Sequence, residues 1–284
     1  MSMPSSAPRF ESLLFLAGTV LSPALQAMPA SNPKQPNIIY IMADDLGYGD
    51  LSCYGQQRFS TPAIDRMAGE GVRFLRHYAG STVSAPSRAS LMTGYHTGHS
   101  PIRGNREVQP EGQMPIPAAI PTVANLLQRA GYTTGCIGKW GLGYPGSEGD
   151  PNQKGFDYFF GYNCQRQAHH YYPDHLWRNQ ERIAYPENST SEKRGAFTHD
   201  LFAEEAIQFI TKNARQPFFL YLTFTMPHAD LDVPENSLAP FRGQFEEVPF
   251  KGGGYLKQDY PAAAFAGMMS RLDGDVGRIV DLVR

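Results

Sequence analysis

Acidic and basic side chains stand directly after three apolar segments of this chain. In sequence order they are Asp44 and Asp45, then Lys139, then His228. If the segments are strands of an open α/β sheet, these side chains gather at one edge, where ligands of such sheets bind. Paired carboxylates suit a hard divalent cation, a lysine suits an anion, and a histidine can transfer a proton. Each residue alone is more often a helix cap, a solvated charge or a structural histidine; their shared position favours a site.

The segment Ser84–Gly94 is expected to begin a helix, because Pro86 suits a first helical turn. A group at Ser84 would then face the N–H groups and the positive dipole end of that helix. Arg88 follows about one turn later, and its guanidinium could reach an anion held at the same end. The layout suits a nucleophile at Ser84, with a divalent cation at the paired acids neutralising developing charge. An ordinary serine-capped helix fits the spacing equally well.

The elements that must position these side chains are expected to alternate between helices and buried strands. Expected strands cover residues 37–43, 132–137 and 217–224, and expected helices cover residues 61–71, 122–130 and 201–213. Nearly continuous apolar strands are typical of a parallel sheet buried on both faces. The pattern predicts an α/β fold with a mainly parallel sheet sandwiched by helices. Residues 143–197 are expected to be mostly loop, with the Tyr, Asn, Gln and His content of a binding wall.

Composition excludes several classes of protein. The 284 residues are 41% hydrophobic, which allows a sizeable core in one large domain or two small ones. Lys and Arg number 25 against 27 Asp and Glu, and the resulting charge of −2 argues against general nucleic-acid binding. Collagen, coiled coil, disorder and a multispanning membrane protein do not fit. Cys53, Cys136 and Cys164 fit no zinc or redox spacing, so buried thiols are expected, with one disulfide possible after export.

The N-terminal residues are expected to direct export. Arg9 precedes the apolar run 13–21, and Ala27 is a plausible last residue before cleavage. We therefore expect a signal peptide over 1–27 and a linker over 28–36, with an exported, periplasmic or secreted protein and no stable membrane anchor. A buried helix or a disordered tail is the alternative.

Three ordered blocks of sequence resemble the sulfatase family of the alkaline phosphatase superfamily. Ser84–Gly94 fits the family pattern of cysteine or serine, any residue, proline, serine and arginine, with a threonine-glycine pair shortly after. Residues 36–47 and 131–140 match the neighbouring family blocks. The resemblance implies an alkaline-phosphatase-like fold that is C-terminally truncated, with residues 37–284 forming the N-terminal portion of a catalytic domain.

The same resemblance assigns a chemistry to these residues. It implies that a maturation enzyme oxidises Ser84 to formylglycine, whose hydrated aldehyde attacks sulfur. Asp44, Asp45 and the modified Ser84 would bind Ca²⁺. Arg88 would orient the modified residue, and Lys139 would contact the sulfate.

The resemblance also implies a proton donor and exposes a departure. His228 aligns with the histidine that contacts the sulfate ester and can protonate the leaving oxygen. The family usually has a second histidine where this chain has Gly141. His169 or His170, from the polar loop region, could take over its part in proton handling.

A second departure concerns the metal. Family members carry a later aspartate-asparagine pair, but Asp273 and Asp275 match the helix that precedes it and are not assigned as ligands. Because Ca²⁺ takes about six to eight oxygen ligands, the assigned residues would leave the site underfilled.

The resemblance therefore predicts a sulfuric ester hydrolase, arylsulfatase-like. Residues 165–179 are rich in aromatic and amide groups and resemble exported bacterial sulfatases that act on sulfated carbohydrates, although a tightly packed structural loop fits this composition equally well. One alternative is a phosphatase or phosphotransferase of the same superfamily that uses unmodified Ser84. Another is a truncated, non-catalytic product. For that product the apolar side of a final helix, including Val276 and Ile279, predicts exposed surface, poor solubility and no sulfatase activity.

Overall fold

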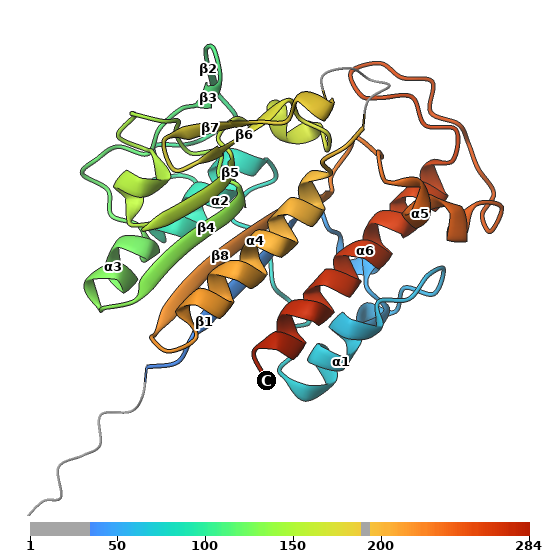
Figure 1. Cartoon of the computed structure of the whole chain (residues 1–284), viewed down its shortest axis with the longest axis horizontal. Helices are drawn as coiled ribbons and strands as arrows, with labels where there is room; N and C mark the ends of the chain where they lie inside the picture. The colour runs from blue at the N-terminus through green and yellow to red at the C-terminus, as the bar shows by residue number, and fades with distance from the viewer. Residues whose placement is uncertain (1–34, 189–193) are drawn as a thin grey trace, which may run out of the picture. The chain divides into compact units, whose positions relative to one another are not determined.

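A six-stranded sheet forms the centre of the computed structural model, which describes residues 35–188 and 194–284 (Figure 1). Its strands follow the order β1 (Ile38–Asp44), β8 (Phe218–Pro227), β4 (Thr133–Lys139), β5 (Tyr158–Tyr162), β6 (His175–Arg178) and β7 (Glu181–Ala184). The first four run parallel, and β6 and β7 extend the sheet in antiparallel pairs. The predicted α/β fold with a mainly parallel sheet is confirmed.

Helices cover both faces of this sheet, and successive side chains of β8 point alternately into the two cores that result. Phe218, Leu220 and Leu222 belong to a cluster that includes residues of α4 and α6, whereas Phe219 and Tyr221 belong to a cluster with residues of α2 and α3. These helices are α2 (Ser84–Thr93), α3 (Val123–Arg129), α4 (Thr198–Asn213) and α6 (Pro261–Leu282). All ten residues of β8 are buried, and burying each large apolar side chain contributes about 1.5–3 kcal/mol.

The remaining described elements are short. They are the hairpin strands β2 (Glu107–Val108) and β3 (Gly112–Gln113), the helices α1 (Pro62–Glu70) and α5 (Glu235–Leu238), and the 3₁₀ turns Tyr48–Asp50, Ser52–Tyr54, Pro151–Lys154, Gln167–His169, Pro186–Asn188 and Ala239–Phe241. None of the helices in residues 35–188 and 194–284 is long and apolar enough to cross a bilayer. The predicted signal peptide and nearly all of the predicted linker lie outside the described residues.

Three expectations need comment. Most of the described residues in 143–197 are loop as expected, but the strands β5, β6 and β7, which were not expected, lie among them. Cys136 and Cys164 are buried thiols as expected, and Cys53, which is only partly buried, is free as well. In the last helix Val276 and Ile279 are buried in the cluster shared with the sheet.

Helix α1 lies beside α6 and takes its cap from that helix (Figure 1). The Asp273 carboxylate accepts hydrogen bonds from the N–H groups of Ala63, at 3.1 Å, and Ile64, at 2.8 Å. Thr61, the residue before this helix, makes no side-chain capping bond to it. Asp273 is thus occupied in joining two helices, which agrees with leaving it out of the metal site.

We expect Asp273→Ala to lower the free energy of unfolding by about 1–2 kcal/mol, because it removes a buried helix cap. Urea denaturation followed by circular dichroism measures the change. Asp281→Ala is the matched control on the same helix, since its ion pair with Arg66 is exposed and such pairs contribute about 0–1 kcal/mol. Equal effects of the two substitutions would contradict the capping role.

Candidate active site

Three neighbouring strands end at the same edge of the sheet and carry charged side chains there. Asp44 is the last residue of β1, Lys139 is the last residue of β4, and His228 follows the end of β8, which lies between them. The parallel pairing of these strands brings residues far apart in the sequence into contact.

Asp44 bridges two buried cations. Its carboxylate oxygens lie 2.5 Å from Lys139 Nζ and 3.2 Å from Arg88 Nη2, and the exposed fractions of the three side chains are 7%, 1% and 2%. Burial pushes the pKa of Asp44 upward, but the charges of Arg88 and Lys139 outweigh it and hold that pKa at about 2. Burial lowers the pKa of Lys139, against the opposing charge of Asp44. An ionised carboxylate therefore joins the two cations.

Arg88 connects this cluster to Ser84. Its Nε donates to Ser84 Oγ at 3.0 Å, and its Nη1 donates to the carbonyl oxygen of Lys139 at 2.5 Å. Ser84 is the first residue of α2, the N-cap is Val83, and no side-chain cap bond is made. The alternative of an ordinary serine-capped helix is therefore wrong, and the Ser84 hydroxyl is free to face the arginine.

Gly138 allows the chain to turn Lys139 into this cluster. Its φ of +114° is left-handed, and a Cβ there would lie 1.9 Å from the carbonyl oxygen of Thr223. Only glycine tolerates that conformation and that contact. The Thr223 hydroxyl donates to the Lys139 carbonyl oxygen at 2.8 Å, which fixes the same turn from β8.

Asp45 and His228 form the exposed side of the site. Asp45 has a φ of +60°, which turns its side chain away from that of Asp44 and leaves it 68% exposed. His228 Nε2 lies 3.3 Å from Asp45 Oδ2. The other ring nitrogen, Nδ1, donates to the carbonyl oxygen of Ala229, so Nε2 is the nitrogen that faces the site.

The predicted metal ligands carry the oxygen atoms that a hard cation prefers, but they are too few to complete its coordination. Asp44, Asp45 and Ser84 offer oxygens, as Ca²⁺ prefers, yet both Asp44 oxygens already bind cationic side chains. Within residues 35–188 and 194–284 no group of three acidic, histidine or cysteine side chains is arranged to hold a metal. The described residues therefore do not by themselves make up a calcium site.

Position 141 has no room for a side chain. A Cβ on Gly141, where φ is +70°, would lie 1.9 Å from Nε2 of Gln165, so the Gln165 carboxamide fills this space. Of the two candidate substitutes, His169 stacks on His228 with ring centroids 4.6 Å apart, whereas His170 lies 3.3 Å from the Asp230 carboxylate. Only His169 contacts the site histidine, and burial, reinforced by the positive charge of His228, lowers its pKa to about 4.

The loop that carries His169 is tied down by a buried histidine further along it. His175 Nε2 lies 2.6 Å from Glu111, and Nδ1 lies 2.8 Å from Asp174. Glu111 also accepts from Trp177 Nε1 at 2.7 Å. Burial lowers the pKa of His175, but the two carboxylates outweigh it and raise that pKa above its ordinary value.

This arrangement predicts a pH-dependent stability. A group whose pKa is raised on folding stabilises fully below its unfolded pKa, about 6.5 for histidine, and the benefit is lost as pH rises through the folded value. The melting temperature of the wild type should therefore exceed that of His175→Gln by more at about pH 5.5 than at about pH 9. A difference that is constant with pH would rule out a charged His175.

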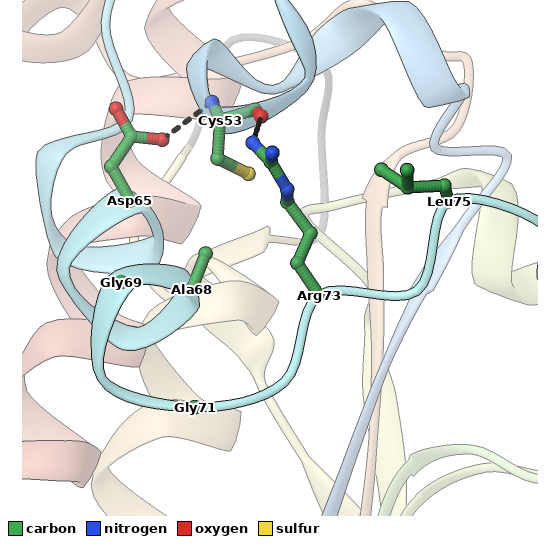
Figure 2. A pocket seen from close by; sticks show the side chains of 7 residues that line it. All are labelled: Cys53, Asp65, Ala68, Gly69, Gly71, Arg73 and Leu75. Carbon is green, nitrogen blue, oxygen red and sulfur yellow. Dashed lines mark hydrogen bonds between the residues drawn. The ribbon is translucent and has the colours of Figure 1, made fainter.

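A separate hollow contains none of the predicted site residues (Figure 2). It is lined by Cys53, Asp65, Ala68, Gly69, Gly71, Arg73 and Leu75. Its polar groups bind one another, since Asp65 accepts from the Cys53 N–H at 2.8 Å and Arg73 donates to the Cys53 carbonyl oxygen. The chemistry-bearing groups therefore lie at the sheet edge and not in this hollow.

Sequence reasoning missed several residues that build the edge. Asn105 accepts from the Ala85 N–H at 2.9 Å and so occupies one N–H group at the start of α2. Thr223 holds the backbone carbonyl of Lys139, and Gln165 fills the space beside Gly141. Loop amides such as Asn105 follow no periodicity, and no local pattern could have singled them out.

Comparisons with known proteins identify the family of this chain. The family model described as Sulfatase matches residues 36–284. Arylsulfatase G of Mus musculus is 36% identical over 225 residues, covering 70% of this chain and 42% of the relative. N-acetylgalactosamine-6-sulfatase of Rattus norvegicus is 36% identical over 270 residues, covering 87% and 49%.

A solved structure gives the same result for the fold. The crystal structure of Ps i-CgsB in complex with k-i-k-neocarrahexaose superposes with a TM-score of 0.74 at 28% identity, covering 88% of this chain and 55% of that one. The chain spans about half the length of the relatives it matches. Since the family model covers residues 36–284, including every residue of the charged edge, this chain belongs to the sulfatase family.

Proposed function

We propose that this protein acts as a sulfuric ester hydrolase in which Ser84, converted to formylglycine, is the nucleophile. The observation that carries the proposal is the contact of Ser84 Oγ with Arg88, itself held by Asp44 and the Lys139 carbonyl. A buried arginine beside a hydroxyl at a helix start, joined through Asp44 to a buried lysine, forms an electrostatic environment suited to an oxyanion. Family membership supports the assignment.

Each side chain then has a defined task. A hydrated aldehyde at position 84 would supply one hydroxyl that attacks sulfur and expels the alcohol. Its second hydroxyl would then lose a proton and reform the aldehyde, which breaks the bond from carbon to the first oxygen and releases sulfate. Arg88 fixes the position of that group through Nε. Lys139 contributes positive charge next to the transferred sulfate, and Nε2 of His228 gives a proton to the departing alcohol oxygen.

Calcium is part of the proposal. Asp44, Asp45 and the group at position 84 would hold the ion, with further oxygens from outside the described set. When bound, the ion would neutralise negative charge on the sulfate.

Sulfated carbohydrates are the proposed substrate class. One relative is called an N-acetylgalactosamine-6-sulfatase, and the similar solved structure contains k-i-k-neocarrahexaose. The proposed partners are therefore a sulfated sugar and a maturation enzyme that oxidises Ser84. We also propose export to the periplasm or beyond, with residues 1–27 as the signal peptide, on the basis of the apolar run 13–21.

Mass spectrometry of the peptide that contains Ser84 tests this proposal. Protein from a host with a serine-processing maturation enzyme should lose the mass of two hydrogen atoms at Ser84. The same preparation should hydrolyse an aryl or sugar sulfate in the presence of Ca²⁺. An unmodified Ser84, together with phosphate ester hydrolysis, would instead support the phosphatase alternative.

A further inference from the structure

Three aromatic rings meet beside the charged edge, and two of them, those of His169 and Tyr255, have no part in the chemistry proposed above. The rings of His169 and His228 lie nearly parallel, with planes 16° apart and centroids separated by 4.6 Å. The Tyr255 ring centroid lies 5.7 Å from that of His169 and 6.3 Å from that of His228. Since His228 also contacts Asp45, the ring cluster adjoins the site.

The rings come from three separate segments that Asp230 holds together. Asp230 is 1% exposed. Its N–H donates to the carbonyl oxygen of His169 at 3.3 Å, and its Oδ1 accepts from the N–H of Leu256 at 2.7 Å. Its Oδ2 lies 3.3 Å from His170 Nδ1. Asp230 lies two residues beyond His228 in the sequence. This one buried residue therefore joins the segment around His169 to the loop that carries Tyr255, next to His228.

Tyr255 presents its ring at the surface of this cluster. Its side chain follows three glycines, Gly252, Gly253 and Gly254, with φ values of +96°, +120° and +95°. Left-handed backbone of this kind is readily adopted only by glycine, and it carries the ring outward, where Tyr255 is 39% exposed. His169 is partly buried behind it. An exposed aromatic ring that abuts two site histidines is placed to contact a bound molecule.

We propose that His169 and Tyr255 form the wall that receives the alcohol part of the sulfate ester, and so determine which esters fit. The proposal rests on the proposed sulfatase function, in which His228 serves the leaving oxygen. The alcohol part departs on the side of His228, and the rings that flank His228 lie on that side. Aromatic faces pack against flat ligand groups, so the wall accepts either a sugar ring or an aryl ring.

Binding measurements on the purified protein with Ca²⁺ separate this wall from the sulfate site. Three ligands are titrated by calorimetry, namely inorganic sulfate, 4-nitrophenyl sulfate and N-acetylgalactosamine 6-sulfate. We expect Tyr255→Ala to weaken binding of at least one ring-bearing ester about tenfold, which corresponds to about 1.4 kcal/mol. Affinity for inorganic sulfate, which has no ring, should stay unchanged.

Conservative variants and neighbours serve as controls. Tyr255→Phe and His169→Phe keep a ring and should retain most of the ester affinity, whereas His169→Ala should lose it. His170→Ala tests the adjacent histidine that points to Asp230, and Tyr95→Ala tests an exposed tyrosine beyond the far end of α2. Both should bind like the wild type, and thermal melting checks that every variant folds.

The outcomes distinguish the two proposals. Loss of affinity for both esters supports a wall for any flat ring, and loss for the sugar ester alone supports a sugar-specific wall. The proposal of a wall is overturned if Tyr255→Ala binds both esters as tightly as the wild type does. It is also overturned if the substitution lowers the affinity for inorganic sulfate as much as the affinity for the esters. Failure of the wild type to bind sulfate or either ester would instead overturn the proposed function.

Discussion

Replacing Ser84 with alanine is expected to abolish sulfate ester hydrolysis. Without the oxygen that Arg88 contacts at 3.0 Å, neither the aldehyde nor a serine nucleophile can form. Removing a catalytic nucleophile lowers kcat by on the order of 10⁴–10⁶-fold in well-studied hydrolases. Initial rates with 4-nitrophenyl sulfate, under matched Ca²⁺ and after maturation in the same host, measure the loss.

Ser90→Ala is the matched control for this experiment. Ser90 lies on the same helix, and its hydroxyl lies 3.4 Å from that of Thr97, away from the charged edge. Its replacement should leave the rate within about twofold, because a substitution distant from the reacting groups usually has a small effect. A Ser84→Ala variant as active as Ser90→Ala would remove Ser84 from the mechanism.

Alanine substitution at the adjacent residues Asp44 and Asp45 is expected to lower the free energy of unfolding to very different extents. Asp44→Ala leaves Arg88 and Lys139 buried without their shared partner, and breaking a buried ion pair costs about 3–5 kcal/mol. Asp45→Ala removes a side chain that is 68% exposed and should cost no more than about 1 kcal/mol, most of it because alanine tolerates the left-handed backbone of this position less well than aspartate. Chemical denaturation without Ca²⁺ measures both, and equal costs would contradict the bridge.

Acid should remove the contribution of Asp44 in a defined range. Its pKa of about 2 lies below the unfolded value of about 3.9. A carboxyl group whose pKa is lowered on folding stabilises the folded state fully at pH values above its unfolded pKa. This stabilisation is lost as pH falls through its folded pKa. The stability difference between the wild type and Asp44→Asn should therefore shrink between about pH 4 and about pH 2. Both carboxylates should be needed for Ca²⁺ affinity, so Asp45→Ala should bind the ion more weakly despite its small loss of stability.

Strand and helix positions could be predicted where burial is continuous. The predicted strand over 217–224 lies within β8 except for its first residue, and the predicted helix over 122–130 contains α3. By contrast, β5, β6 and β7 were missed. The strand β5 is only five residues long and lies in a region rich in polar residues, and the partly exposed residues of β6 and β7 carry no long apolar run. Their pairing depends on the neighbouring strand β5, which local sequence does not reveal.

The charged edge was predictable only in outline. Position after a strand brought Asp44 and Lys139 to the same edge, but nothing in the sequence shows that Asp44 is shared with Arg88. That bridge depends on the helix α2 approaching from another part of the chain. Likewise, the filling of position 141 by Gln165 depends on two loops meeting, and the wall residue Tyr255 lies in a loop with no matching motif.

The alternation of β8 between two cores also has a consequence for amide hydrogen exchange. Its N–H groups bond to neighbours on both sides of the sheet, and its side chains are buried on both faces. Such amides exchange only through the largest unfolding events. The N–H groups of residues 218–224 should therefore be the slowest to take up deuterium, while the Gly252–Gly254 segment should exchange early. A boundary between protected and quickly exchanging amides then runs through the site, with Lys139 and Asp44 on the protected side and Tyr255 on the other.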